Sequence, residues 1–242
     1  MARLFVSDVH LDASAPDATE QFVDFLNIYA KGAEALYILG DLFEVWVGDD
    51  DPTPEKQHII DALRRLTHSG VGCFIIHGNR DFLLGRQFCD RSGCRMLQDP
   101  IIAELDGERV LVTHGDALCT DDHSYQELRS IVRTPDWQRR FLALPFAVRD
   151  ALANKARKGS KAHTERTAPQ IQDVNPQAVE LAFRTTGVRR IIHGHTHRPA
   201  IHDLLIDGEP AQRIVLGAWY EEGSYLIYEN GHYELKILQR RP

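Results

Sequence analysis

The segment Ile191-Ile192-His193-Gly194-His195-Thr196-His197 places an apolar run of strand type directly before two histidines spaced one residue apart. Histidines at such positions are rarely placed for packing, and imidazole is the commonest metal ligand in proteins. The same order, an apolar run and then a metal-ligand residue type, recurs nearer the N-terminus. Asp8 and His10 follow residues 3–7, Asp41 follows 36–39, Asn79 follows 73–76, and His114 follows 110–113.

Helical patterns separate these runs. Apolar residues recur on one helical face in residues 19–31 and 54–68, and residues 82–92 look helical up to Gly93. Residues 200–238 alternate as strands, with turn signals at Asp207-Gly208 and Asn230-Gly231. This order predicts an α/β sandwich around a mixed sheet. Since loops at the carboxyl ends of such strands converge, the polar residues are expected in one crevice.

The mixture of Asp, Asn and His in this crevice suits Mn²⁺, Fe²⁺ or Zn²⁺. Glycines at positions 40, 78, 115 and 194 allow sharp backbone turns beside the ligands. There are more donors than one ion needs, which favours two ions that share a carboxylate. Such a pair can orient and deprotonate water and stabilise charge on a phosphoryl group. We therefore expect a hydrolase that cleaves a phosphorus–oxygen bond.

Taken together, Asp8-x-His10, Gly40-Asp41, Gly78-Asn79, His114 and Gly194-His195-x-His197 resemble the calcineurin-like metallophosphoesterase superfamily. The resemblance implies a four-layer α/β/β/α sandwich. It also implies one metal held by Asp8, His10 and His197, a second held by Asn79, His114 and His195, and Asp41 as the bridge between them.

Arg80 departs from the pattern of many members, which have a histidine after this asparagine to protonate an alkoxide leaving group. An arginine stays charged and cannot act as that acid. This favours a leaving group that is already good, such as a phosphate displaced from a pyrophosphate, whose second phosphate Arg80 could bind in a bidentate manner. The alternative is that Arg80 is a solvated loop residue.

Residues 129–166 form a basic and apolar stretch. They contain ten Lys or Arg against three acids, a local charge of +7, so the rest of the chain carries −14. Trp137, Phe141 and Leu144 share one predicted helical face. Such an insertion could bind a substrate that is both anionic and apolar, or rest on an anionic membrane. It could also be an ordinary amphipathic hairpin with a solvated basic face.

Longer strings narrow the resemblance to the UDP-2,3-diacylglucosamine hydrolases of lipid A biosynthesis. They are residues 40–46 (GDLFEVW), 77–82 (HGNRDF), His114-Gly115-Asp116 with Thr120-Asp121-Asp122, and Asp173-Val174-Asn175-Pro176. The resemblance implies that water attacks the α-phosphate to give UMP and 2,3-diacylglucosamine 1-phosphate, with two Mn²⁺ per subunit. It implies one domain over residues 1–242 with a helical lid at 121–173, acting peripherally at the cytoplasmic face of the inner membrane.

The same resemblance implies site residues. Asp41, Asn79, Arg80, His114 and His195 would be catalytic, and Asn79, Arg80, Asp122, Ser160, Thr164 and His195 would contact substrate. Asp122 could equally be a helix N-terminal residue and Ser160 a plain loop residue. Family members tend to have Asn and Lys where this chain has Thr164 and Thr167, and Thr167 supplies no positive charge, so these contacts depart from the family pattern.

Composition excludes some other classes. The net charge of −7 argues against nucleic-acid binding, and no export signal is expected at the N-terminus. Cys73, Cys89, Cys94 and Cys119 are expected as reduced thiols, with Cys89 and Cys94 as weak metal-ligand candidates.

We expect a monomer. The alternatives are a phosphodiesterase or nucleotide pyrophosphatase for a soluble substrate, and a metal-holding scaffold without catalysis.

Overall fold

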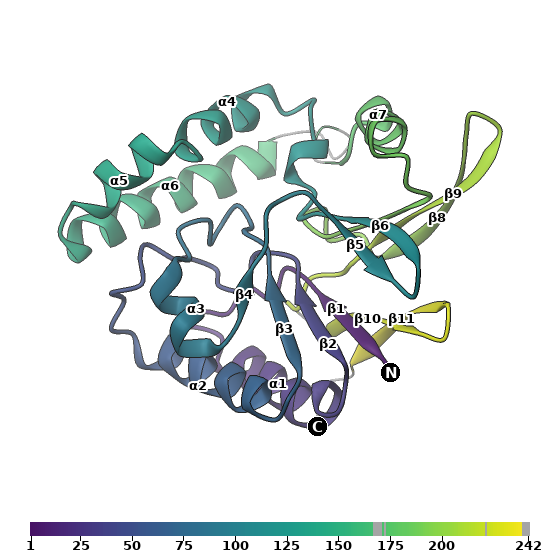
Figure 1. The fold of residues 1–242 in the computed structure, drawn as a ribbon. Coiled ribbons are helices and arrows are strands. Elements are labelled where there is room, and N and C mark those ends of the chain that lie inside the picture. Colours follow the sequence, from purple (N-terminus) through teal and green to yellow (C-terminus); the bar gives the residue numbers. More distant parts are fainter. Residues whose placement is uncertain (167–170, 172, 221, 239–242) are drawn as a thin grey trace.

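Two β-sheets stand face to face in the computed structural model, which describes residues 1–166, 171, 173–220 and 222–238 (Figure 1). The first sheet has the order β11-β10-β1-β2-β3-β4. Its parallel strands are β1 (Arg3–Val6), β2 (Ala35–Ile38), β3 (Gly72–Ile75) and β4 (Arg95–Met96), and β10 (Gly223–Glu229) and β11 (His232–Leu238) extend it antiparallel.

The second sheet has the order β5-β6-β7-β9-β8. It comprises β5 (Ile101–Leu105), β6 (Glu108–Val112), β7 (Arg190–His193), β8 (Ala200–Ile206) and β9 (Glu209–Val215). Strand β7 lies parallel to both β6 and β9, and the outer strands are antiparallel. Buried side chains of both sheets, such as Phe5 and Leu226 from one and Val112 and Ile192 from the other, form the core between them.

Helices cover the two outer faces and complete four layers. Helices α1 (Pro16–Phe25), α2 (Pro54–His68) and α3 (Arg86–Ser92) cover the first sheet, and α7 (Pro176–Thr186) covers the second. The stripe predicted on residues 54–68 is buried as expected, with Ile59, Ile60, Leu63 and Leu66 in the core. The predicted α/β/β/α sandwich is therefore confirmed.

Some boundaries differ from the sequence prediction. The helix predicted over residues 82–92 begins only at Arg86, because the Asp49 carboxylate accepts hydrogen bonds from the backbone N–H groups of Gly85 and Phe88. A cap so distant in sequence leaves no local signal. Strand β5 was not predicted, and the helix predicted at 19–31 starts at Pro16 and becomes a π-helix over Leu26–Ala30. The predicted hairpin turns at Asp207-Gly208 and Asn230-Gly231 are confirmed.

Three further helices, α4 (His123–Val132), α5 (Pro135–Leu142) and α6 (Phe146–Arg166), lie outside the four layers (Figure 1). They lie over the loops that follow β2 and β3. Arg149 of α6 is buried and bonds to Val47 O and Asp50, while Trp137 of α5 packs against Phe82 with ring centroids 6.1 Å apart. Within the described ranges, no helix is both long enough and apolar enough to cross a membrane.

Candidate metal centre

The metal-ligand residue types sit on the loops that directly follow five strands, as predicted. Strands β1, β2 and β3 of the first sheet lead to Asp8 and His10, to Asp41 and to Asn79, and β6 and β7 of the second lead to His114 and to His195 and His197. These seven side chains converge at one edge of the sandwich. Two separate sheets therefore contribute to a single cluster of oxygen and nitrogen donors.

One group of donors consists of Asp8, His10 and His197, whose ligand atoms all lie within 4.8 Å of one another. His197 Nε2 is 3.2 Å from Asp8 Oδ1 and 3.3 Å from His10 Nε2. Two imidazole nitrogens that face each other and a carboxylate at this distance form a set of ligands that suits a divalent cation.

The second group surrounds Asn79. Its Oδ1 lies 2.9 Å from His114 Nε2 and 3.0 Å from His195 Nδ1. Asp41 lies between the two groups, with Oδ2 3.9 Å from His10 Nε2 and Oδ1 3.9 Å from His114 Nε2. One oxygen of the Asp41 carboxylate thus faces each group of donors.

The backbone of these loops is held in an uncommon conformation. Asp8, His10, Asp41, His195 and His197 all have φ between 53° and 68°, a left-handed region that side chains rarely adopt. Each such residue costs on the order of 1 kcal/mol, and such residues cluster at functional sites. The surrounding fold must therefore hold these five residues in place.

Close packing explains why glycine recurs beside the ligands. A Cβ atom at Gly78 would lie 2.0 Å from Asp41 Oδ1, and one at Gly194 would lie 2.3 Å from Asp8 Oδ2. No other residue fits at these positions without displacing a carboxylate. The sequence predicts these glycines for sharp turns alone, whereas in the structure they also allow the close approach of neighbouring loops.

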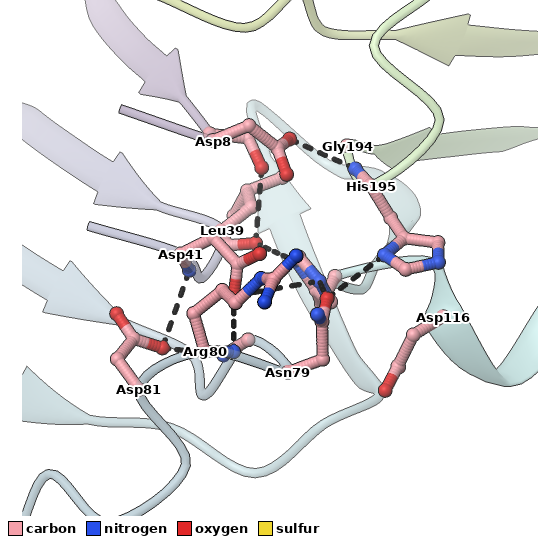
Figure 2. Close-up of polar contacts among 12 residues, drawn as sticks. Asp8, Leu39, Asp41, Asn79, Arg80, Asp81, Asp116, Gly194 and His195 are labelled. Atoms are coloured by element: carbon pink, nitrogen blue, oxygen red, sulfur yellow. Dashed lines mark hydrogen bonds and ion pairs between the residues drawn. The ribbon is translucent and has the colours of Figure 1, made fainter. Parts of the chain in front are cut away.

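Asp81 joins two of the loops and was not singled out as a site residue from the sequence. Figure 2 shows its carboxylate beside Asp41. It accepts hydrogen bonds from the backbone N–H groups of Gly78 at 2.9 Å, Asp41 at 3.2 Å and Leu42 at 2.8 Å. Asp81 is fully buried, so these bonds fix Asp41 and the Asn79 loop relative to each other.

Asp116 joins α4 to the centre and was also missed as a site residue. Its buried Oδ2 accepts from Tyr125 Oη at 2.5 Å and Arg129 Nε at 2.8 Å, and it lies 3.4 Å from Arg133. Tyr125 also stacks on His195, with ring centroids 6.0 Å apart. Two basic side chains of the predicted insertion are therefore bound to a protein carboxylate.

Charge in the site favours a cation. Burial of the His114 ring lowers its pKa, but the Asp41 and Asp8 carboxylates outweigh this effect and raise the pKa to about 9. Burial is also the main reason that the pKa of Asp41 rises to about 6 and that the pKa of His195 falls to about 3. A bound cation would therefore stabilise the buried carboxylates. The His195 ring is neutral, as a metal-binding histidine must be.

Hydrogen bonds of the imidazole rings fit the same conclusion. His114 Nδ1 lies 2.8 Å from Leu39 O and donates to it, and a second proton on Nε2 would be needed for the bond to Asn79 Oδ1. A cation would replace this proton and leave the Nε2 lone pair as a ligand. A second bond from the other ring nitrogen to a carbonyl or carboxylate is typical of metal-binding histidine.

The predicted substrate contacts have mixed outcomes. Arg80 is at the centre, where its backbone N–H donates to Asp41 Oδ1 at 2.8 Å, and Figure 2 shows its side chain beside Asn79. Asp122 caps α4 by accepting from the backbone N–H of Tyr125 at 3.0 Å, the structural alternative considered for it. Ser160 and Thr164 belong to α6, but their side chains lie outside the described part, as does all of Thr167.

The cysteines are free thiols. Cys94 is buried, with its Sγ 3.2 Å from that of Cys73, and Cys89 is half-buried. None belongs to the groups of described residues that could hold a metal, which consist of the aspartates and histidines above. The structure thus gives Cys89 and Cys94 no part in this centre.

Comparisons with known proteins agree with this geometry. The sequence model of the calcineurin-like phosphoesterases matches residues 1–199. The chain is 51% identical over 236 residues to a UDP-2,3-diacylglucosamine hydrolase of Aeromonas salmonicida, covering 98% of this chain and 93% of the relative. It is 49% identical over 247 residues to one of Stenotrophomonas maltophilia, covering 99% and 100%.

A solved structure shares the fold. An archaeal phosphodiesterase with 15% sequence identity superposes with a TM-score of 0.53, over 98% of this chain and 100% of the other. At this identity the likeness concerns the fold alone. The matched sequence model and the full-length relatives show that the chain belongs to the calcineurin-like phosphoesterase family and, within it, to the family of UDP-2,3-diacylglucosamine hydrolases.

Proposed function

We propose that this protein hydrolyses the pyrophosphate bond of UDP-2,3-diacylglucosamine to UMP and 2,3-diacylglucosamine 1-phosphate, a step of lipid A biosynthesis. The convergence of seven donor side chains from two sheets carries this proposal. Relatives of about 50% identity over nearly the whole chain bear the name of this activity. A scaffold without catalysis would not need a complete set of ligands held in strained backbone conformations.

In this proposal two Mn²⁺ ions bind, one at Asp8, His10 and His197 and one at Asn79, His114 and His195, with Asp41 between them. Bound divalent cations would lower the pKa of water and neutralise phosphoryl charge. Asn79 and His195 are also proposed to donate hydrogen bonds to phosphate oxygens.

Arg80 is proposed to bind the phosphate of the leaving group. Its bond to Asp41 Oδ1 holds the backbone at the centre, and its guanidinium stays charged throughout the reaction. Since the leaving phosphate is stable as an anion, it needs charge stabilisation more than a proton. This agrees with an arginine where many relatives in the superfamily have histidine.

Helices α4 to α6 are proposed as the lid, within an insertion at residues 121–173. A cavity of about 220 Å³ lies under α6, lined by Leu11, Phe43 and Ile59 of the core and by Asn154 and Arg157 of α6. These helices and the loop between α5 and α6 carry exposed apolar side chains, namely Leu128, Ile131, Leu142, Leu144, Val148 and Leu152. Apolar surface beside basic residues is suited to a lipid substrate and to peripheral binding at an anionic inner membrane.

A Mn²⁺-dependent assay of UMP release from UDP-2,3-diacylglucosamine tests the proposal. We expect turnover by the wild type and none by Asp41→Ala, together with two bound Mn²⁺ per chain in the wild type. A substrate without acyl chains should not be turned over. Equal turnover of that substrate would instead favour a pyrophosphatase for soluble nucleotides. Sedimentation of the chain, and flotation with anionic vesicles, test the expected monomer and the peripheral membrane binding.

A further inference from the structure

Glu44 lies next to the metal centre but is absent from the proposed set of ligands. It is on the loop between β2 and α2, with its side chain 12% exposed. Its Oε2 lies 2.7 Å from Nδ1 of His10, whose other nitrogen, Nε2, faces His197 at 3.3 Å. If Nδ1 carries the proton that points to Glu44, Nε2 presents its lone pair to the site.

The other oxygen of Glu44 contacts an arginine of α6, a helix that lies outside the four layers. Arg157 of α6 places its Nε 3.0 Å from Glu44 Oε1, and its Nη1 is 3.5 Å from Asp12 Oδ2. Glu44 Oε2 therefore lies against the imidazole, and Oε1 lies against the guanidinium. Direct binding of Glu44 to a metal ion would therefore break at least one of these contacts.

The backbone keeps Glu44 in register with His10. The N–H of His10 donates to Asp41 O at 2.9 Å, and the N–H of Glu44 donates to Leu11 O at 3.1 Å. The loops after β1 and β2 thus run side by side, so Glu44 is held opposite His10 by the same pairing that sets Asp41 in the centre. A rotation of the His10 ring would break the contact with Glu44.

We infer that Glu44 is a positioning residue that fixes the orientation and tautomer of His10, and that Arg157 couples α6 to the metal centre through it. The inference rests on the metal centre of the proposed function. Loss of such a partner behind a metal-binding histidine typically weakens metal affinity by about 10–100-fold. Docking of α6 and occupancy of the Asp8–His10–His197 group would therefore be linked.

Titration of the metal-depleted chain with Mn²⁺ tests this inference. We expect two ions in the wild type, and about 10–100-fold weaker binding of one of them in Glu44→Ala. Glu44→Gln should be affected less, because an amide oxygen still accepts from Nδ1. Arg157→Gln should weaken the same ion, whereas Lys155→Gln, which removes a positive charge from an exposed position of α6, should keep wild-type affinity.

A second readout does not depend on metal or activity. Nitrogen-15 spectra of the metal-depleted chain should show the His10 ring protonated at Nδ1 in the wild type and as a mixture of tautomers in Glu44→Ala, with His10→Gln identifying the signal. Urea unfolding shows whether each variant folds. If Glu44→Ala folds, binds two Mn²⁺ ions tightly and leaves the His10 signal unchanged, this inference is wrong while the proposed metal centre stands. A wild type with fewer than two ions would overturn the proposed metal centre, and this inference with it.

Discussion

Replacement of Asp81 by asparagine should separate two loops of the metal centre. Both oxygens of Asp81 accept short bonds from backbone N–H groups, Oδ1 from Gly78 at 2.9 Å and Oδ2 from Leu42 at 2.8 Å. An asparagine keeps the size but turns one acceptor into a donor that faces an N–H group. A hydrogen bond to a charged group contributes about 1.5–3 kcal/mol and a buried unsatisfied group costs a similar amount. We expect a loss of about 3 kcal/mol in the free energy of unfolding.

Urea unfolding of the metal-depleted chain measures this loss, and Mn²⁺ titration of the same variant should show weaker binding because Asp41 is no longer fixed. Asp90→Asn is a matched control. Asp90 forms an ion pair with Arg86 on the surface of α3, with side chains 65% and 92% exposed, so its change should stay within about 0.5 kcal/mol. A loss below about 1 kcal/mol in Asp81→Asn, with unchanged Mn²⁺ binding, would refute the role given to Asp81.

Three further changes have defined outcomes. The folded pKa of His114 is about 9, above its ordinary value, so the stabilisation that protonated His114 gives the metal-depleted protein should be fully present below about pH 6.5 and lost as pH rises through 9; a fall in Tm between these pH values measures this contribution, and Mn²⁺ should remove it. Gly194→Ala places a Cβ 2.3 Å from Asp8 Oδ2 and should lower UMP release by roughly 100-fold, so near-normal rates would contradict the packing argument. Tyr125→Phe removes one bond to Asp116 and should cost about 1–3 kcal/mol in urea unfolding, with Tyr29→Phe, on an exposed ring, as the control.

Local sequence was sufficient for most of the strands and helices and for the candidate ligands of the metal centre. Apolar runs of strand length that end in Asp8, Asp41 or His195 predict both a strand and a ligand at its carboxyl end, because parallel strands open to the same edge. The turns at Asp207-Gly208 and Asn230-Gly231 were predictable for a similar reason, since the residues themselves favour positive φ. In these cases the physical cause lies within a few residues of the feature.

Tertiary structure alone decided which side chains support the ligands. The sequence reveals no pairing of Glu44 with both His10 and Arg157, which lie 34 and 113 positions away, and none of Asp116 with Arg129. Such contacts depend on how two sheets and the helices outside them pack, and a surface charge and a buried partner look alike in a sequence. Short-range propensities and periodicity determine strands, turns and loop ends, whereas long-range packing determines which charges meet.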